Sequence, residues 1–154
     1  SAGSPGLVLR TEDYGRSWQE TYRDDSPTIF FDAMDFWDKK KGIAFSDAQG
    51  NFLGLIKTFD GGQNWINDSI PINLFAHPDQ GGFAASGTCI HTQGDGAWSI
   101  VLGGIGANMI SFNSVSQGYS GLSIDHLDFG APSKGAFSID FKSPDTLIVV
   151  GGDY

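Results

Sequence analysis

Basic residues are scarce in this chain of 154 residues. Lys and Arg number 9 against 18 Asp and Glu, which gives a net charge of −9. Proteins that bind nucleic acids or anionic membranes use Lys and Arg to neutralise phosphate groups. The one basic cluster here, three lysines at residues 39–41, is flanked by Asp35 and Asp38. We therefore expect neither nucleic acid nor an anionic membrane surface as a partner.

The sequence also lacks a second cysteine and a long apolar segment. Cys89 is the only cysteine, so no internal disulfide can form. No apolar stretch reaches the ~18 residues of a membrane-spanning helix, and the first residues do not read as a signal peptide. We expect no membrane span and no signal peptide within the chain. An extracellular or periplasmic location is compatible with this composition, because bacterial secreted proteins often lack disulfides.

Patterns for metals and cofactors are missing as well. His77, His91 and His126 do not have metal-ligand spacing, and there is no C-x-x-C pair. Residues 104–109 begin like a dinucleotide-binding loop but lack the third glycine and the helix that should follow. Cys89 and His91 lie two apart on an expected strand, so they form either a nucleophile pair or a buried thiol beside a structural histidine. We expect no metal and no cofactor.

Glycine and aromatic residues, in contrast, are abundant. The chain has 22 glycines, and 13% of its residues are aromatic. Each glycine in a helix costs about 1 kcal/mol relative to alanine, and no stretch keeps a 3.6-residue apolar period. The composition therefore predicts an all-β protein of short strands joined by tight turns.

Two segments of the chain, residues 11–18 and 58–65, repeat the pattern T-x-D-x-G-x-x-W. They lie 47 residues apart, and each follows an apolar run. In such a turn the aspartate can accept backbone N–H groups, the glycine supplies a positive φ, and the tryptophan can bury its ring. The positions to which we assign these structural roles are Thr11, Asp13, Gly15, Trp18, Thr58, Asp60, Gly62 and Trp65.

The repeat unit is about 50 residues long and contains four short strand-like runs. Four strands every 40–50 residues are typical of a β-propeller blade. We predict a single propeller segment of four-stranded antiparallel blades. It divides into a half-blade at 1–25, blades at 26–72 and 83–130, and a half-blade at 131–154. The strands of the first full blade are predicted at 29–36, 42–47, 52–58 and 65–69. Those of the second are predicted at 86–92, 97–102, 108–112 and 122–127.

The repeated motif resembles the Asp-box, or bacterial neuraminidase repeat. That repeat occurs in sialidases, xyloglucan-cleaving glycosidases, sortilin-type receptors and propellers similar to the photosystem II assembly and stability factor. A third copy is degenerate, with Asn113 in the aspartate place and neither glycine nor tryptophan in register. The wider pattern, including "GIAFSD" at 42–47 and "FSIDF" at 137–141, is most similar to the assembly-factor-like propellers. This resemblance implies a non-catalytic scaffold for protein binding or assembly.

A carbohydrate-active hydrolase is the alternative function. A sialidase site needs arginines from several blades, and all three arginines here fall within the first 23 residues. A glycosidase with two aspartates stays open, because Asp35 and Asp140 occupy equivalent positions on expected innermost strands, as Asp47 and Asp153 do at strand ends. The other interpretation is that these aspartates recur because each blade needs them for its own hydrogen bonding.

Glycan binding without catalysis is a third possibility. Trp37 lies at a strand end next to charged residues, where its ring can stack on a sugar or pack between blades. The partner is therefore either a protein or a glycan. Propellers close with 4–8 blades, so about three blades of chain predict either a fragment of a larger propeller or closure by pairing with another copy or between the two half-blades.

Overall fold

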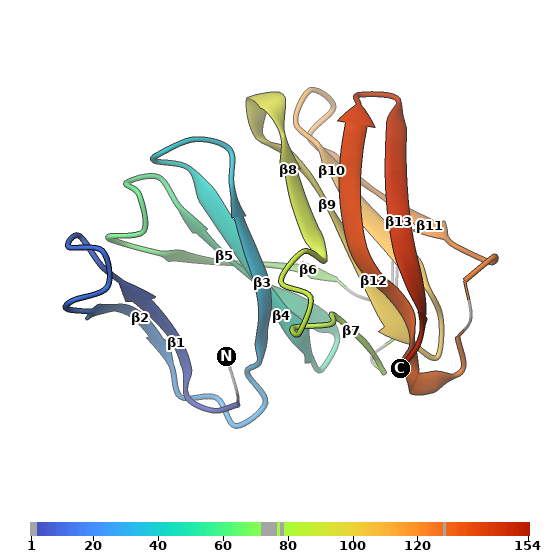
Figure 1. Ribbon diagram of the computed structural model, residues 1–154, viewed down its shortest axis with the longest axis horizontal. Coiled ribbons are helices and arrows are strands. Elements are labelled where there is room, and N and C mark those ends of the chain that lie inside the picture. Colours follow the sequence, from blue (N-terminus) through green and yellow to red (C-terminus); the bar gives the residue numbers. More distant parts are fainter. Residues whose placement is uncertain (1–2, 72–76, 78, 128) are drawn as a thin grey trace.

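The computed structural model describes residues 3–71, 77, 79–127 and 129–154. This part of the chain is all-β and antiparallel, with one short 3₁₀ turn (Gly94–Gly96) and no α-helix (Figure 1). The all-β prediction is thus confirmed. The strands are β1 (Gly6–Arg10), β2 (Gln19–Asp24), β3 (Phe31–Phe36), β4 (Gly42–Gln49), β5 (Phe52–Thr58), β6 (Ile66–Pro71), β7 (Gln80–Gly81), β8 (Ile90–Gln93), β9 (Ala97–Gly104), β10 (Asn108–Asn113), β11 (Gly118–Ser123), β12 (Ala131–Ser143) and β13 (Thr146–Asp153).

The strands form three sheets in which chain neighbours pair. β1 and β2 make a hairpin, and β3, β4, β5 and β6 make a four-stranded sheet in sequence order. β8, β9, β10 and β11 also pair in sequence order, within a seven-stranded sheet that β7, β12 and β13 join through β9. The junction requires glycine, because a Cβ on Gly135 of β12 would lie 2.3 Å from Gly103 Cα, and a Cβ on Gly103 of β9 would lie 2.6 Å from Lys134 O.

The predicted strand at 122–127 is wrong beyond Ser123, because β11 runs from Gly118 to Ser123. The predicted strand at 86–92 is also wrong over its first four residues, because β8 begins at Ile90. The chain reverses directly after β10, in a tight turn between Asn113 and Gly118. Asn113 Oδ1 accepts hydrogen bonds from the backbone N–H groups of Val115 (2.9 Å) and Ser116 (3.0 Å), and Gln117 has φ +52°. An asparagine that accepts two backbone N–H groups stabilises this turn without the glycine of the full motif.

Two hydrophobic cores lie on opposite faces of the four-stranded sheet. Ile43 and Phe45 of β4 face the larger core, with Trp98 and Ile100 of β9 on its other side, while Ala44 faces the smaller core with Val8 of β1. Successive side chains of a strand point to opposite faces. All three consecutive β4 residues are therefore fully buried, because sheets cover both faces of β4.

The first and the last strand of the described chain each have one edge without a paired strand. Among the described residues, β1 pairs only with β2 and β13 only with β12, and these hairpins lie at opposite sides of Figure 1. β13 exposes Leu147, Ile148 and Val150. No helix in the described part of the chain is long and apolar enough to cross a membrane. Of the segment at 71–82, which we expect to be a longer loop between the two blades, residues 72–76 and 78 lie outside the described residues.

Candidate functional site

The two T-x-D-x-G-x-x-W turns are closed by their own hydrogen bonds. In the first turn, Asp13 Oδ1 accepts from Thr11 Oγ1 (2.8 Å) and from the backbone N–H of Ser17 (2.9 Å). Thr11 Oγ1 in turn accepts from the backbone N–H of Gly15, whose φ is +84°. These bonds, with that from the Ser17 hydroxyl first, lower the pKa of Asp13 to about 2. The carboxylate is therefore used by the turn itself.

The second turn repeats this geometry. Asp60 accepts from Thr58 Oγ1 (2.9 Å) and from the backbone N–H and side-chain amide of Asn64 (2.9 and 2.7 Å). Thr58 Oγ1 accepts from the N–H of Gly62, which has φ +80°. The bonds from Asn64 and Thr58 lower the pKa of Asp60 to about 2. Thr58 is buried, which ties this turn to the core of the four-stranded sheet.

The two tryptophans of the motif differ in burial. Trp65 is half-buried, contacts Phe36 edge to face and packs against the smaller core. Trp18 is 59% exposed, so the prediction that its ring is buried is wrong. Its indole N–H donates to Gly15 O (3.1 Å), so the ring covers its own turn. Trp65 packs against a core formed by both the β1–β2 hairpin and the four-stranded sheet, whereas Trp18 packs against neither of the two cores.

Asp35 and Asp140 lie on the two strands that flank β8. Asp35 Oδ2 of β3 accepts from the backbone N–H (2.8 Å) and hydroxyl (2.9 Å) of Thr92. Asp140 Oδ1 of β12 lies 3.3 Å from Nδ1 of His91. The structure therefore brings both predicted aspartates to the same short strand, where each contacts a different β8 residue. Asp35 is bound to backbone, and the Asp140 side chain is 79% exposed.

Trp37 and Cys89 both contact the larger hydrophobic core. The Trp37 ring is half-buried, packs against the larger core, and donates its indole N–H to Ala97 O (2.7 Å). Trp37 thus joins the four-stranded sheet to β9. Cys89 is fully buried, and burial raises the pKa of its thiol to about 11, so it is no thiolate nucleophile at neutral pH.

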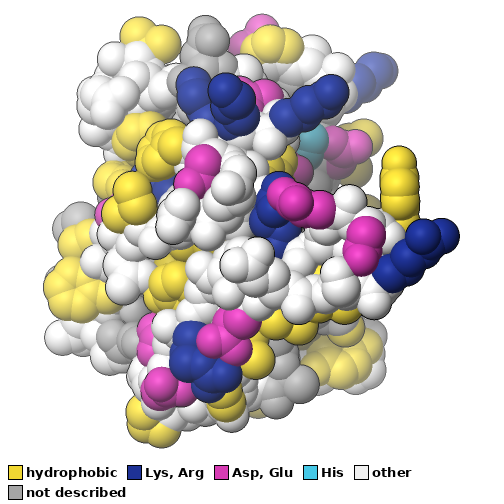
Figure 2. All heavy atoms as spheres, turned by 90° about the vertical axis from the view of Figure 1, so that its left-hand side faces the viewer, with side chains coloured by type: hydrophobic (Ala, Val, Ile, Leu, Met, Phe, Trp, Pro, Cys, Tyr) yellow, Lys and Arg dark blue, Asp and Glu magenta, His cyan; other side chains and the backbone are white. Residues whose placement is uncertain are grey.

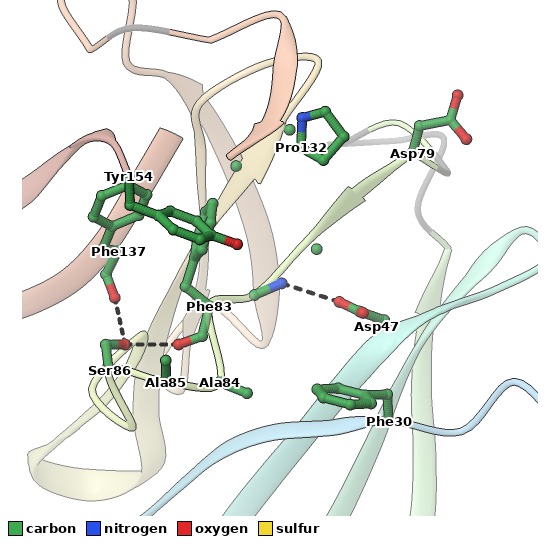
Figure 3. A pocket seen from close by; sticks show the side chains of 14 residues that line it. Phe30, Asp47, Asp79, Phe83, Ala84, Ala85, Ser86, Pro132, Phe137 and Tyr154 are labelled. Atoms are coloured by element: carbon green, nitrogen blue, oxygen red, sulfur yellow. Dashed lines mark hydrogen bonds between the residues drawn. The ribbon is translucent and has the colours of Figure 1, made fainter. Parts of the chain in front are cut away.

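A hollow of about 730 Å³ opens between β4, the segment after β7, and the β12–β13 hairpin. Phe83, Phe137 and Tyr154 form one wall, and Phe30 and Asp47 form the opposite wall (Figure 3). Ser86 ties the first wall together, because its hydroxyl lies 2.8 Å from Phe83 O and 2.6 Å from Phe137 O. We call this hollow the aromatic–acidic pocket; the residues used to define it are Phe30, Asp47, Asp79, Phe83, Phe137 and Tyr154.

Two β-bulges place a pair of carboxyl groups at the edge of this pocket. The β3–β4 register shifts between Phe31 and Ala33, so Asp32 is the extra residue, and the β4–β5 register shifts between Phe45 and Ala48. A bulge re-aims side chains that regular pleating would send elsewhere. Asp32 is consequently only 5% exposed within a strand whose neighbouring residues are also buried.

Asp47 connects the pair to the pocket. Its Oδ1 accepts from the backbone N–H of Gly82 (3.0 Å), and its own backbone N–H donates to Phe30 O (3.1 Å). Gly82 lies so close to Asp32 that a Cβ would come within 2.8 Å of the Asp32 side chain. Asp47 thus lines the pocket, and Asp32 lies behind it.

The carboxyl pair is short of hydrogen-bond donors. Neither oxygen of Asp32 accepts a hydrogen bond of good geometry among the described residues, and the polar groups beside it are the carboxyl and the backbone N–H of Asp47. Burial first, and then the charge of Asp47, raises the pKa of Asp32 to about 8. Burial also raises the pKa of Asp47. At neutral pH the pair therefore holds a proton, because two buried like charges in contact are unfavourable.

Sequence reasoning singled out Asp47 as a recurring strand-end residue but missed Asp32. One signal was present: Asp32 interrupts the apolar run at residues 29–34, where an unpaired acid is costly. The aromatic wall had no such signal, because Phe83, Phe137 and Tyr154 come from three separate segments. Within the described ranges, no group of three His, Cys, Asp or Glu side chains could hold a metal ion.

No family model, no curated protein and no solved structure matches this chain.

Proposed function

We propose that this chain is a non-catalytic binding module, built from Asp-box blades, that docks a partner protein. The observation that carries the proposal is that three of the recurring aspartates accept hydrogen bonds from the fold itself. Asp13 and Asp60 accept hydrogen bonds within their own turns, and Asp35 accepts from Thr92 of the neighbouring strand. A catalytic carboxylate must be free to reach a substrate, and these three are engaged in the fold.

The surface supports a protein partner. Trp18, Phe59 and Ile66 are each more than half exposed. On the face seen in Figure 2, exposed hydrophobic side chains lie among charged ones of both signs, without an extended basic area. Exposed aromatic and aliphatic side chains with a polar surround are the kind of surface that protein interfaces bury.

A glycoside hydrolase is the second candidate, and the Asp32–Asp47 pair favours it, because a carboxyl with a raised pKa is what a general acid requires. The position of the pair argues against it. Glycosidases hold their two carboxyl groups about 5–10 Å apart across the scissile bond. Here Asp32 is buried behind Gly82 and faces the other carboxyl, so it cannot contact a sugar in the pocket.

Turnover assays separate the two functions. The chain is incubated with nitrophenyl glycosides and sialosides, alongside the variants Asp35→Asn and Asp47→Asn and the control Asp145→Asn, an exposed residue of the β12–β13 turn. We expect no release of nitrophenol above the buffer rate. Turnover that disappears in Asp47→Asn or Asp35→Asn, but not in Asp145→Asn, would overturn the proposal. Binding of sialyllactose or maltohexaose without turnover would favour the lectin-like alternative.

A further inference from the structure

We propose that the aromatic–acidic pocket binds a cationic group, and that its occupant is a lysine or arginine side chain of the partner protein. This inference rests on the proposed binding function and specifies the chemistry of that partner. It is argued from the charge of the pocket lining, the arrangement of its rings and the donors that its carboxyl pair lacks.

The lining has negative charge only. Asp47 and Asp79 line the pocket, and no Lys, Arg or His does so among the described residues. The nearby Lys134 of β12 forms an ion pair with Asp153 at 3.8 Å. The whole chain has a net charge of −9, so its field also attracts basic segments.

The aromatic wall suits a cation. Phe83, Phe137 and Tyr154 contact one another edge to face, with ring centroids 4.3, 5.7 and 5.9 Å apart. The rings are mutually tilted, so the wall as a whole exposes both ring faces and ring edges, and Tyr154 and Phe137 lie beside each other on one side of the hollow in Figure 3. Ammonium and guanidinium groups bind over aromatic faces, and this cation–π interaction becomes stronger when water is excluded.

The carboxyl pair supplies the second half of the site. Asp47 accepts one hydrogen bond from the backbone N–H of Gly82, and it accepts a second from the carboxyl of Asp32 when Asp32 holds the shared proton. No other side chain donates to either carboxyl group among the described residues. An ammonium or guanidinium group carries several N–H donors and a positive charge. Placed between Asp47 and the aromatic wall, it donates to Asp47 and neutralises a carboxylate that burial disfavours. A neutral sugar brings hydroxyl donors but not the charge.

The size of the hollow is also appropriate. About 730 Å³ lies in the range of pockets that enclose small ligands. It accepts one long basic side chain together with part of the backbone that presents it. Asp79, at the rim in Figure 3, is exposed and can meet a second basic group of the same segment.

The test is a titration with short capped peptides, observed by NMR at the backbone amide of Gly82, which donates to Asp47. The probes are acetyl-Gly-Gly-Lys-Gly-Gly-amide, the same peptide with arginine, the same peptide with acetyl-lysine, and n-butylamine as a free amine. The variants are Asp47→Asn, Tyr154→Ala and the charge-matched control Asp145→Asn. Asp79→Asn gives a second acidic variant, at an exposed residue of the pocket rim.

We expect the lysine and arginine peptides to shift the Gly82 amide and the acetyl-lysine peptide to bind at least about tenfold more weakly, because acetylation removes the charge. Asp47→Asn should weaken binding about tenfold and Asp79→Asn less, as expected when a charge-assisted bond becomes neutral. Asp145→Asn should leave the affinity unchanged. Equal binding of acetyl-lysine, or no effect of Asp47→Asn, would overturn the inference, and butylamine binding as tightly as the peptides would overturn its assignment to a partner protein. None of these results depends on glycoside turnover, so failure here is distinct from failure of the proposed function.

Discussion

Asp35 of β3 and Thr92 of β8 are joined by two hydrogen bonds, from the backbone N–H at 2.8 Å and from the hydroxyl at 2.9 Å. The two residues are 57 positions apart and belong to different sheets. On the other side of β8, Asp140 meets His91. β8 is only four residues long and is therefore held by acidic side chains from both neighbouring strands, in addition to its pairing with β9.

The unequal burial of the motif tryptophans predicts unequal effects on stability. Trp65→Ala should lower the free energy of unfolding by about 2–3 kcal/mol, because the ring packs against Phe36 and the smaller core. Trp18→Ala should lower it by less than about 1 kcal/mol, since that ring is 59% exposed. Urea unfolding followed by circular dichroism measures both. Equal losses would mean that Trp18 is covered in solution.

The Asp32–Asp47 pair predicts an unusual dependence of stability on pH. Above about pH 4 an unfolded chain ionises Asp32, as it does any solvated aspartate, whereas the folded protein keeps this carboxyl protonated because its pKa is raised to about 8. The folded state then binds more protons than the unfolded state, so stability falls as pH rises through this window, by at most about 1.4 kcal/mol per pH unit. Asp13 and Asp60 each have a pKa lowered to about 2, so in the folded protein they are already ionised throughout this pH window.

Asp32→Asn removes the ionisable group and should flatten this decline. The stability of the variant relative to the original chain should therefore increase between pH 5 and pH 8 in urea unfolding experiments. Asp145→Asn, with the same loss of one charge in an exposed turn, should follow the original chain at every pH. Parallel pH profiles for the original chain and Asp32→Asn would show that Asp32 ionises normally in the folded protein.

The close packing of β7 on the carboxyl pair predicts a strong effect of a single methyl group. A Cβ on Gly81 would overlap Asp47 Oδ1, whereas a Cβ on Gly94 would meet nothing within 4 Å. Gly81→Ala should destabilise the protein by about 1–3 kcal/mol, because the carboxylate or β7 must move. Gly94→Ala should change stability by less than about 0.5 kcal/mol. Thermal unfolding of the two variants compares the sites directly, and similar melting temperatures would contradict the close contact of β7 with β4.

Most strand positions could be predicted from the sequence, because strands bounded by turn residues leave a local signal. The prediction of 52–58 coincides with β5, and 42–47 falls within β4. The prediction failed after Asn113, where the turn is compact although it lacks the full motif. It also failed at Trp18, whose ring is 59% exposed although its turn has the full motif.

The candidate site could be predicted only in part. The spacing of the two turns indicates hydrogen bonding by Asp13 and Asp60, and each accepts a backbone N–H group within its own turn. The approach of Asp32 to Asp47 depends on two bulges, which the apolar pattern does not reveal because a bulge changes the pairing register and not the composition. The pocket also depends on contacts between distant segments, such as those of Phe83 with Phe137 and Tyr154.

The proposal that this chain binds rather than cleaves depends on its recurring aspartates having structural roles. A double-mutant cycle between Asp35→Ala and Thr92→Val, measured by urea unfolding, tests this most directly. The account predicts a coupling energy of about 1 kcal/mol between the two side chains, the contribution of one such hydrogen bond. A coupling energy of zero would contradict it, because the Asp35 carboxylate would then gain nothing from the Thr92 hydroxyl that it contacts in the structure.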